Sequence, residues 1–91
     1  MAQPANLRET LTTVDLPWAE VILEGGSESS AALINVMTRL IDELVAGQVL
    51  EVISQVAGVS LDLGEWCHRA GHDVLRELVD GDQIRLWIRR Q

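Results

Sequence analysis

The stretch Val74-Leu-Arg-Glu-Leu-Val-Asp-Gly-Asp-Gln-Ile-Arg-Leu-Trp-Ile88 decides the fold, because it predicts two β-strands joined by a tight turn. Branched and other apolar side chains are frequent in both halves, as they are in strands. Between the halves, Asp80-Gly81-Asp82 is a strong signal for a β-hairpin. The sequence therefore predicts strands over 74–79 and 84–88.

The second of these strands alternates between two kinds of side chain. Since successive side chains of a strand point to opposite faces of the sheet, we expect one face to receive Ile84, Leu86 and Ile88 and the other to receive Arg85, Trp87 and Arg89. The apolar set would face the core. An outward Trp beside Arg is common in protein-binding patches, so the second set is a candidate interaction surface. Edge packing or a dimer contact would explain it equally well.

Two helices are predicted upstream of the hairpin. Apolar residues over 33–44 recur at helical spacing and predict an amphipathic helix that ends at Gly47. A second helix follows, capped by Ser60 or Asp62 and ended by Gly71, at the position where a left-handed residue terminates a helix.

Two further strands complete the pattern. The run Val49–Gln55 is short, rich in β-branched residues and apolar on both faces, which predicts a central strand. Val21–Leu23, broken by Gly25-Gly26, predicts a first strand. The order β-α-β-α-β-β indicates an α/β (α+β) two-layer sandwich, with both helices on one face of a four-stranded mixed sheet. We expect residues 1–18 to be an N-terminal extension that docks on a domain over 19–91, with Trp18 as its anchor.

Composition limits the class of protein. The chain of 91 residues is long enough for one small domain. Its formal net charge of −7 disfavours nucleic acid or an anionic membrane as the main partner. One cysteine excludes an intramolecular disulfide, and no metal-ligand set accompanies it. We therefore expect no metal and no cofactor. Because the sequence has the pattern of neither a signal peptide nor a membrane span, we expect a cytoplasmic location.

Several segments carry motifs of a known protein family. Asp62-Leu-Gly-Glu-Trp-Cys67 and then Gly71-His72 are similar to the Asp-Ile-Pro-x-Trp-Cys and Gly-His motifs of the TusA/SirA-like sulfur-carrier family. Leu44-Val-Ala-Gly-Gln-Val-Leu50 resembles its Leu-x-x-Gly-x-x-Leu link, and Ile88-Arg-Arg90 resembles its Ile-Arg-Lys ending. The match covers roughly residues 21–90. The resemblance implies the same β-α-β-α-β-β fold and a role in passing sulfur between proteins.

The chain departs from the family where the family's nucleophile lies. In the family, the first strand leads to Arg-Gly and then to Cys-Pro-x-Pro, whose cysteine carries the persulfide. This chain has Glu24-Gly-Gly-Ser-Glu-Ser-Ser-Ala31, with the cysteine position at Ser27 or Glu28 and neither proline present. The candidate site at the start of the first helix is therefore Ser27, Glu28, Ser29 and Ser30. A serine hydroxyl is too weakly acidic to ionise there and cannot hold transferable sulfur, so the family's mechanism is expected to be lost.

Cys67 is the remaining candidate nucleophile. Buried free cysteines usually behave as small hydrophobes, and we favour that interpretation. The alternative is a reactive thiol, although His68 points about a hundred degrees away from its neighbour on a helix. His72 lies beyond the helix end and is expected to be structural, as is Trp66 in the core.

We therefore expect a domain of this family that is not an enzyme and serves as a protein-interaction or accessory module in sulfur transfer or redox metabolism. It would be a monomer or a weak homodimer. An active carrier using Cys67 as the persulfide site is the alternative, and a nucleic-acid-binding domain is a second one, suggested only by the fold.

Overall fold

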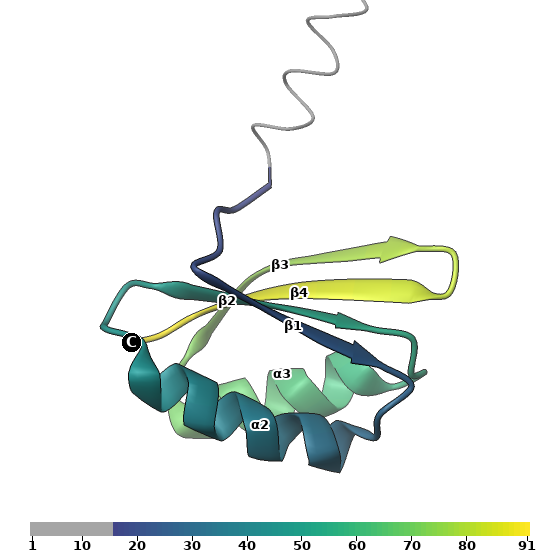
Figure 1. Cartoon of the computed structure of the whole chain (residues 1–91), viewed down its shortest axis with the longest axis horizontal. Coiled ribbons are helices and arrows are strands. Elements are labelled where there is room, and N and C mark those ends of the chain that lie inside the picture. The colour runs from purple at the N-terminus through teal and green to yellow at the C-terminus, as the bar shows by residue number, and fades with distance from the viewer. Residues whose placement is uncertain (1–15) are drawn as a thin grey trace, which may run out of the picture.

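A computed structural model describes residues 16–91 and confirms the expected element order and the two-layer sandwich. The elements are β1 (Val21–Gly26), α2 (Ser30–Glu43), β2 (Val49–Ser54), α3 (Val59–Ala70), β3 (Asp73–Asp80) and β4 (Gln83–Arg89). Figure 1 shows both helices on the same side of the sheet, with residues 16–20 approaching β1 from the other side. The expected extension over 1–18 lies largely outside the described residues.

The sheet is mixed, in the order β1-β2-β4-β3. Strands β1 and β2 are parallel, while β4 is antiparallel to both of its neighbours, β2 and β3. The run expected to be central is indeed internal, because β2 lies between β1 and β4. The turn between β3 and β4 contains Gly81 with a φ of 63°, a left-handed conformation that glycine adopts without a steric penalty.

The core lies between the sheet and the two helices. Side chains at every fourth position contribute from each helix, because such positions share one helical face. These buried residues are Leu33, Met37 and Ile41 of α2 and Val59, Leu63 and Cys67 of α3. From the sheet, Leu50, Val52, Leu86 and Ile88 complete the cluster.

Both helices differ from the expectation at one end. Helix α2 ends at Glu43, before Gly47, because Leu44 is already extended (φ −81°, ψ 154°). The guanidinium of Arg90 donates hydrogen bonds to the exposed carbonyls there, including those of Ile41 (2.7 Å) and Leu44. A contact from a residue so distant in sequence is not visible in a local pattern.

The start of α3 also corrects the prediction. The helix begins at Val59 after Gly58, whose φ of 85° turns the chain into it. No side chain caps this end, and Ser60 and Asp62 lie inside the first turn. The predicted end is confirmed: Gly71 is left-handed (φ 82°) and its N–H donates to the carbonyl of Cys67.

A third correction concerns the exposure expected for Trp87. Its neighbours in β4, Leu86 and Ile88, belong to the core cluster, so Trp87 points to the face without helices, as predicted. However, only 1% of the residue is exposed. The guanidinium of Arg85 lies 4.8 Å from the ring centroid and is held by Glu51 at 2.8 Å, so charged neighbours cover the ring. Trp87 is therefore not an exposed interaction patch.

Trp18 was expected to be packed and is exposed, the reverse of Trp87. We expected this side chain to anchor the N-terminal extension, yet 80% of it is exposed. The polypeptide is tied at this point by the backbone of Glu20, whose N–H donates to the carbonyl of Val49 at 3.0 Å. The Glu20 carboxylate accepts the Val49 N–H in return, at 2.7 Å.

Candidate functional site

The candidate site is the turn that joins β1 to α2. Helix α2 begins at Ser30, and Ser29 is its N-cap: the Ser29 Oγ accepts the backbone N–H of Ala32 at 3.2 Å. Ser27 and Glu28 precede the cap and are exposed, and the Glu28 N–H donates to the carbonyl of Gly25 at 3.0 Å. The structure thus brings the four predicted site residues together at one helix end, with distinct roles.

Two glycines set the path of this turn. A Cβ atom at Gly25 would lie 2.5 Å from the Leu33 side chain and 3.1 Å from the Ile53 carbonyl, so a side chain there would force Leu33 to shift. Gly26 has a φ of 52°, and its carbonyl accepts the Gln55 N–H at 2.8 Å. The strand end is therefore held firmly against both α2 and β2.

The chemistry available at this turn is that of a helix N-terminus. Unpaired N–H groups and the positive end of the helix dipole favour an anionic group there. A cysteine thiolate would be stabilised by the same groups. In this chain the neutral hydroxyl of Ser29 accepts one of these N–H groups. The turn therefore caps the helix and can contact other molecules, but it carries no thiol.

Cys67 lies away from this turn, in the core. It is 1% exposed and belongs to the cluster between sheet and helices, which confirms the core interpretation. Burial raises the pKa of the Cys67 thiol to about 11, since a thiolate would lose its hydration there. At neutral pH the side chain is therefore a protonated thiol, the unreactive form.

This raised pKa predicts a loss of stability in alkali. The unfolded chain releases the thiol proton at the ordinary pKa, near 9.0, while the folded chain keeps it until about 11. Between these values the folded state binds more protons, so the free energy of unfolding should fall by about 1.4 kcal/mol per pH unit. Urea titrations over this range should show the decline in the native protein and its absence in Cys67→Ala. Parallel curves for the two proteins would contradict the assignment.

The two histidines have different surroundings. His72 packs against Trp66, with ring centroids 5.8 Å apart, and its Nδ1 accepts the Gln91 N–H at 3.2 Å. This contact supports the structural role expected for His72. Trp66 is half-buried and packs against the core cluster, and His68 is exposed.

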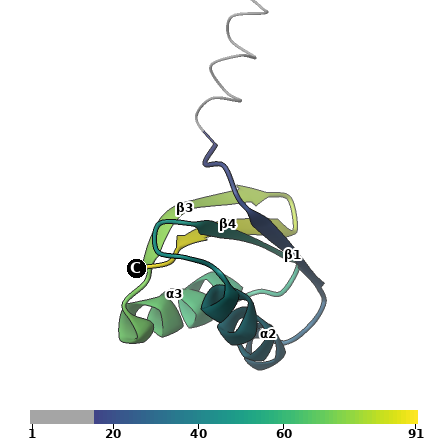
Figure 2. The same ribbon diagram turned by 60° about the vertical axis from the view of Figure 1, so that its left-hand side comes forward.

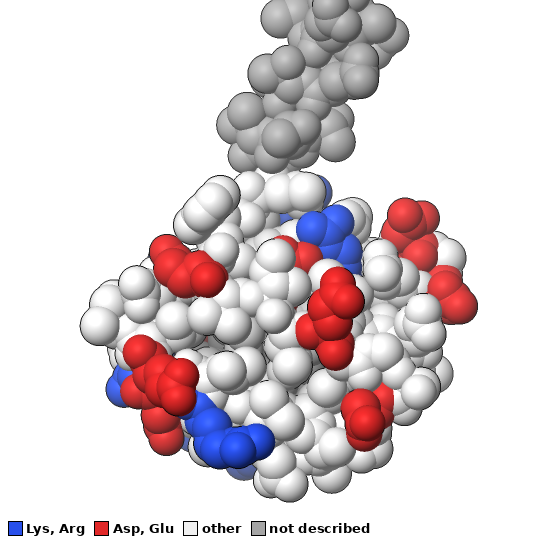
Figure 3. All heavy atoms as spheres, viewed as in Figure 1, with Lys and Arg blue, Asp and Glu red and all other residues white. Residues whose placement is uncertain are grey.

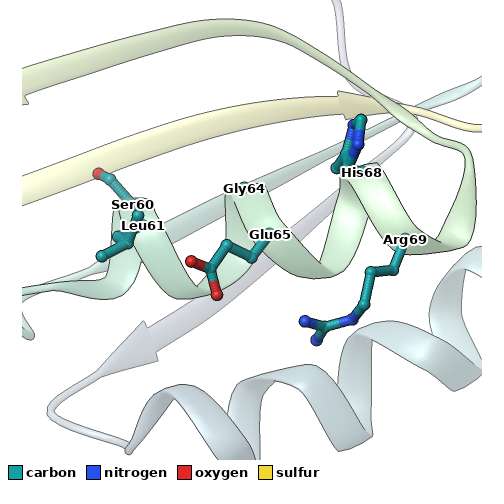
Figure 4. Close-up of a pocket in the computed structure, with 6 residues that line it drawn as sticks. All are labelled: Ser60, Leu61, Gly64, Glu65, His68 and Arg69. Atoms are coloured by element: carbon teal, nitrogen blue, oxygen red, sulfur yellow. The ribbon is translucent and has the colours of Figure 1, made fainter.

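Two hollows border α3, and sequence reasoning missed both. The first, of about 420 Å³, exists because Gly64 has no side chain between Ser60 and His68, one turn away on either side. Figure 4 shows Ser60 and His68 directed toward the sheet and Arg69 directed toward α2. The second, of about 460 Å³, lies where α3 meets β3. The available signal was the glycine inside a helical pattern, which leaves space when no neighbour fills it.

These hollows offer little catalytic chemistry. The Ser60 hydroxyl donates to the Glu77 carboxylate, and His68, the histidine that lines the same hollow, lies two helical turns further along α3. Over residues 16–91 there is no group of three or more side chains that could hold a metal ion. In the same part of the chain, no helix is long and apolar enough to cross a membrane.

Comparison with known proteins bears on this site. No family model matches the chain. A stretch of 52 residues, 57% of the chain, is 36% identical to the putative sulfur carrier protein YrkI of Bacillus subtilis (strain 168) and covers 69% of that protein. The chain belongs to the TusA/SirA-like sulfur-carrier family. This TusA/SirA-like protein shares the family's fold as well, with β1 leading directly into α2.

The surface of this TusA/SirA-like protein is predominantly acidic, with fourteen acidic against seven basic residues in the sequence. In Figure 3 the acidic side chains are dispersed over the visible face and the basic ones are fewer. The described residues thus show no broad basic surface on that face. Binding of nucleic acid usually requires such a surface, because basic side chains neutralise the phosphates.

Proposed function

We propose that this TusA/SirA-like protein docks on proteins of sulfur transfer or redox metabolism without itself carrying sulfur at the start of α2. The observation that supports this most directly is Ser29 at the N-cap of α2, where its Oγ accepts a backbone N–H. A thiol at this helix end would be activated, and a hydroxyl is not. A single cysteine without a disulfide fits the reducing cytoplasm, where we place this role.

Docking requires that the turn between β1 and α2 keep the shape it has in the family although the family's cysteine is absent from it. The close packing of Gly25 against Leu33 and Ile53 preserves the sharp turn between β1 and α2. Ser27 and Glu28 remain exposed on it. A partner that recognises the outline of this turn could therefore bind without receiving sulfur.

An active carrier that uses Cys67 is the rival function. One observation favours it: Cys67 borders the hollow between α3 and β3, together with His68 and His72. Burial and the raised pKa of the thiol oppose it, because attack on a sulfur donor requires a thiolate that the donor can reach. We therefore place Cys67 in the core and outside the functional chemistry.

Intact-mass analysis separates the two functions. The native protein is expected to gain no sulfur from polysulfide or from a persulfidated rhodanese at neutral pH. The urea-unfolded protein should become modified, and unfolded Cys67→Ser should not, which shows that the thiol itself is competent. A gain of one sulfur atom by the native protein that is lost in Cys67→Ser and passes to an acceptor would overturn the proposal.

The docking role has its own readout. An excess of the native chain should slow sulfur transfer from a persulfidated donor to a family member that has the cysteine, because the two would compete for one surface. No slowing with any of the sulfurtransferases tested would contradict docking, even if the chain accepts no sulfur.

A further inference from the structure

Strand β3 forms one edge of the sheet, next to β4 (Figures 1 and 2). Exposed large hydrophobic side chains concentrate there: of the seven among the described residues, four lie on β3 or on α3. These are Leu61 (67% exposed), Val74 (40%), Leu75 (39%) and Val79 (61%). An apolar cluster beside an unpaired strand edge is typical of an interaction surface.

Helix α3 and strand β3 form this surface together. The Ser60 hydroxyl donates to the Glu77 carboxylate, which ties the first turn of α3 to the middle of β3. Leu61 follows Ser60 in the helix, and Val79 shares the helix-facing side of the strand with Glu77. A partner that pairs with the edge would therefore also meet these apolar side chains.

The pattern on β3 indicates what this partner is. After the β-bulge at Leu75, the segment Arg76–Asp80 is regular. Arg76, Leu78 and Asp80 lie opposite Trp87, Arg85 and Gln83 of β4 and point to the face without helices. Along this face the side chains are thus positive, apolar and negative in turn. Two copies of this segment that run antiparallel would place each positive side chain opposite a negative one.

We propose that β3 pairs antiparallel with β3 of a second copy, about a two-fold axis at Leu78. Leu78 then lies opposite the partner's Leu78, and Arg76 of each copy lies opposite Asp80 of the other. Such an isologous contact joins the two four-stranded sheets into one of eight strands. Cross-strand pairs of opposite charge flank an apolar pair, an arrangement that stabilises antiparallel sheets.

Other registers of the same two strands are less favourable. Opposite residues of an antiparallel pair share a face, so a symmetric pair must be centred on a residue. Centring on Arg76 or Glu77 places like charges opposite each other, and centring on Val79 sets Leu78 against Asp80. Of these registers, only the one centred on Leu78 pairs an apolar side chain with an apolar one and each Arg76 with an Asp80 of opposite charge.

Charge exchange tests this register directly. In Asp80→Arg and in Arg76→Asp, both cross-strand pairs become like-charged, and we expect each variant to dimerise at least about tenfold more weakly than the native chain. The double variant Arg76→Asp/Asp80→Arg restores opposite charges and should dimerise as the native chain does. An equimolar mixture of the two single variants should form heterodimers, because every charged pair is again complementary.

Sedimentation equilibrium of the full chain, from about 1 μM to about 1 mM, measures these constants and covers the range of small interfaces. Asp82→Arg is the matched control: it makes the same charge change on the same hairpin, in the turn and outside the paired segment Arg76–Asp80, and should change the constant by less than about twofold. A native chain that stays monomeric throughout, or a dimer that the double variant fails to restore, would overturn the proposal. The outcome is independent of sulfur carriage and of docking.

Discussion

Replacing Trp87 with alanine is expected to lower the free energy of unfolding by about 3–5 kcal/mol, the range for a large aromatic removed from a packed interior. The ring is 1% exposed and lies on β4 opposite Glu51 of β2 and Arg76 of β3. Its loss would leave a cavity on the face of the sheet without helices and remove the contact with the Arg85 guanidinium. Urea denaturation followed by far-ultraviolet circular dichroism measures the change.

Trp18→Ala is the control for this prediction. It deletes the same indole from a position that is 80% exposed, where substitutions usually change stability by less than about 0.5 kcal/mol. If the two variants lost similar amounts of stability, the ring of Trp87 would not be packed as described. If Trp87→Ala were neutral, it would return Trp87 to the candidate interaction surface.

A cysteine placed at the cap of α2 is expected to be far more reactive than the native one. In Ser29→Cys, made in a Cys67→Ala background, the thiolate would accept the Ala32 N–H that Ser29 now accepts and would face the positive end of the helix. Its pKa should therefore lie below the ordinary value, near 9.0. Cys67, with a pKa of about 11, should react with iodoacetamide more than about a hundredfold more slowly at pH 7.

The rate of iodoacetamide labelling against pH gives both pKa values. Asn35→Cys in the same background is the control, since this exposed residue lies beyond the first turn of α2, where the backbone N–H groups are paired within the helix, and should titrate near the ordinary value. A cap cysteine that titrates at or above that value would mean that the turn has lost the electrostatic property on which sulfur carriers of this kind depend. The docking surface would then be altered as well.

Local patterns predicted the fold well because each signal lies within a few residues. The alternation in β4, the Asp80-Gly81-Asp82 turn and the left-handed Gly71 each depend on neighbouring residues alone. The end of α2 does not. It is set partly by Arg90, which reaches the helix carbonyls from the far end of the sequence. A residue pattern around Gly47 carries no trace of that contact.

The candidate site was less predictable. Several serines could have capped α2, and the local pattern does not distinguish Ser29, whose Oγ accepts the Ala32 N–H, from its neighbours. Cys67 was easier, because it continues the buried face of Val59 and Leu63 at intervals of four. For Trp87, the alternation of side chains predicted the correct face of the sheet. That Arg85 and Glu51 cover the ring could not be predicted, because it depends on how β2 and β4 are aligned in the sheet.

The position of β4 has a kinetic consequence. This strand follows all the others in the sequence, yet it lies between β2 and β3 and contributes Leu86 and Ile88 to the core. During synthesis, β1, β2 and the helices can form a parallel pair with local helices, but β3 has no neighbour until β4 has left the ribosome. The pairing of β4 with β2 joins segments that are distant in sequence, and closing such pairs is slow. The nascent domain therefore exposes much of its apolar surface until β4 arrives, and that interval is when chaperones would meet it.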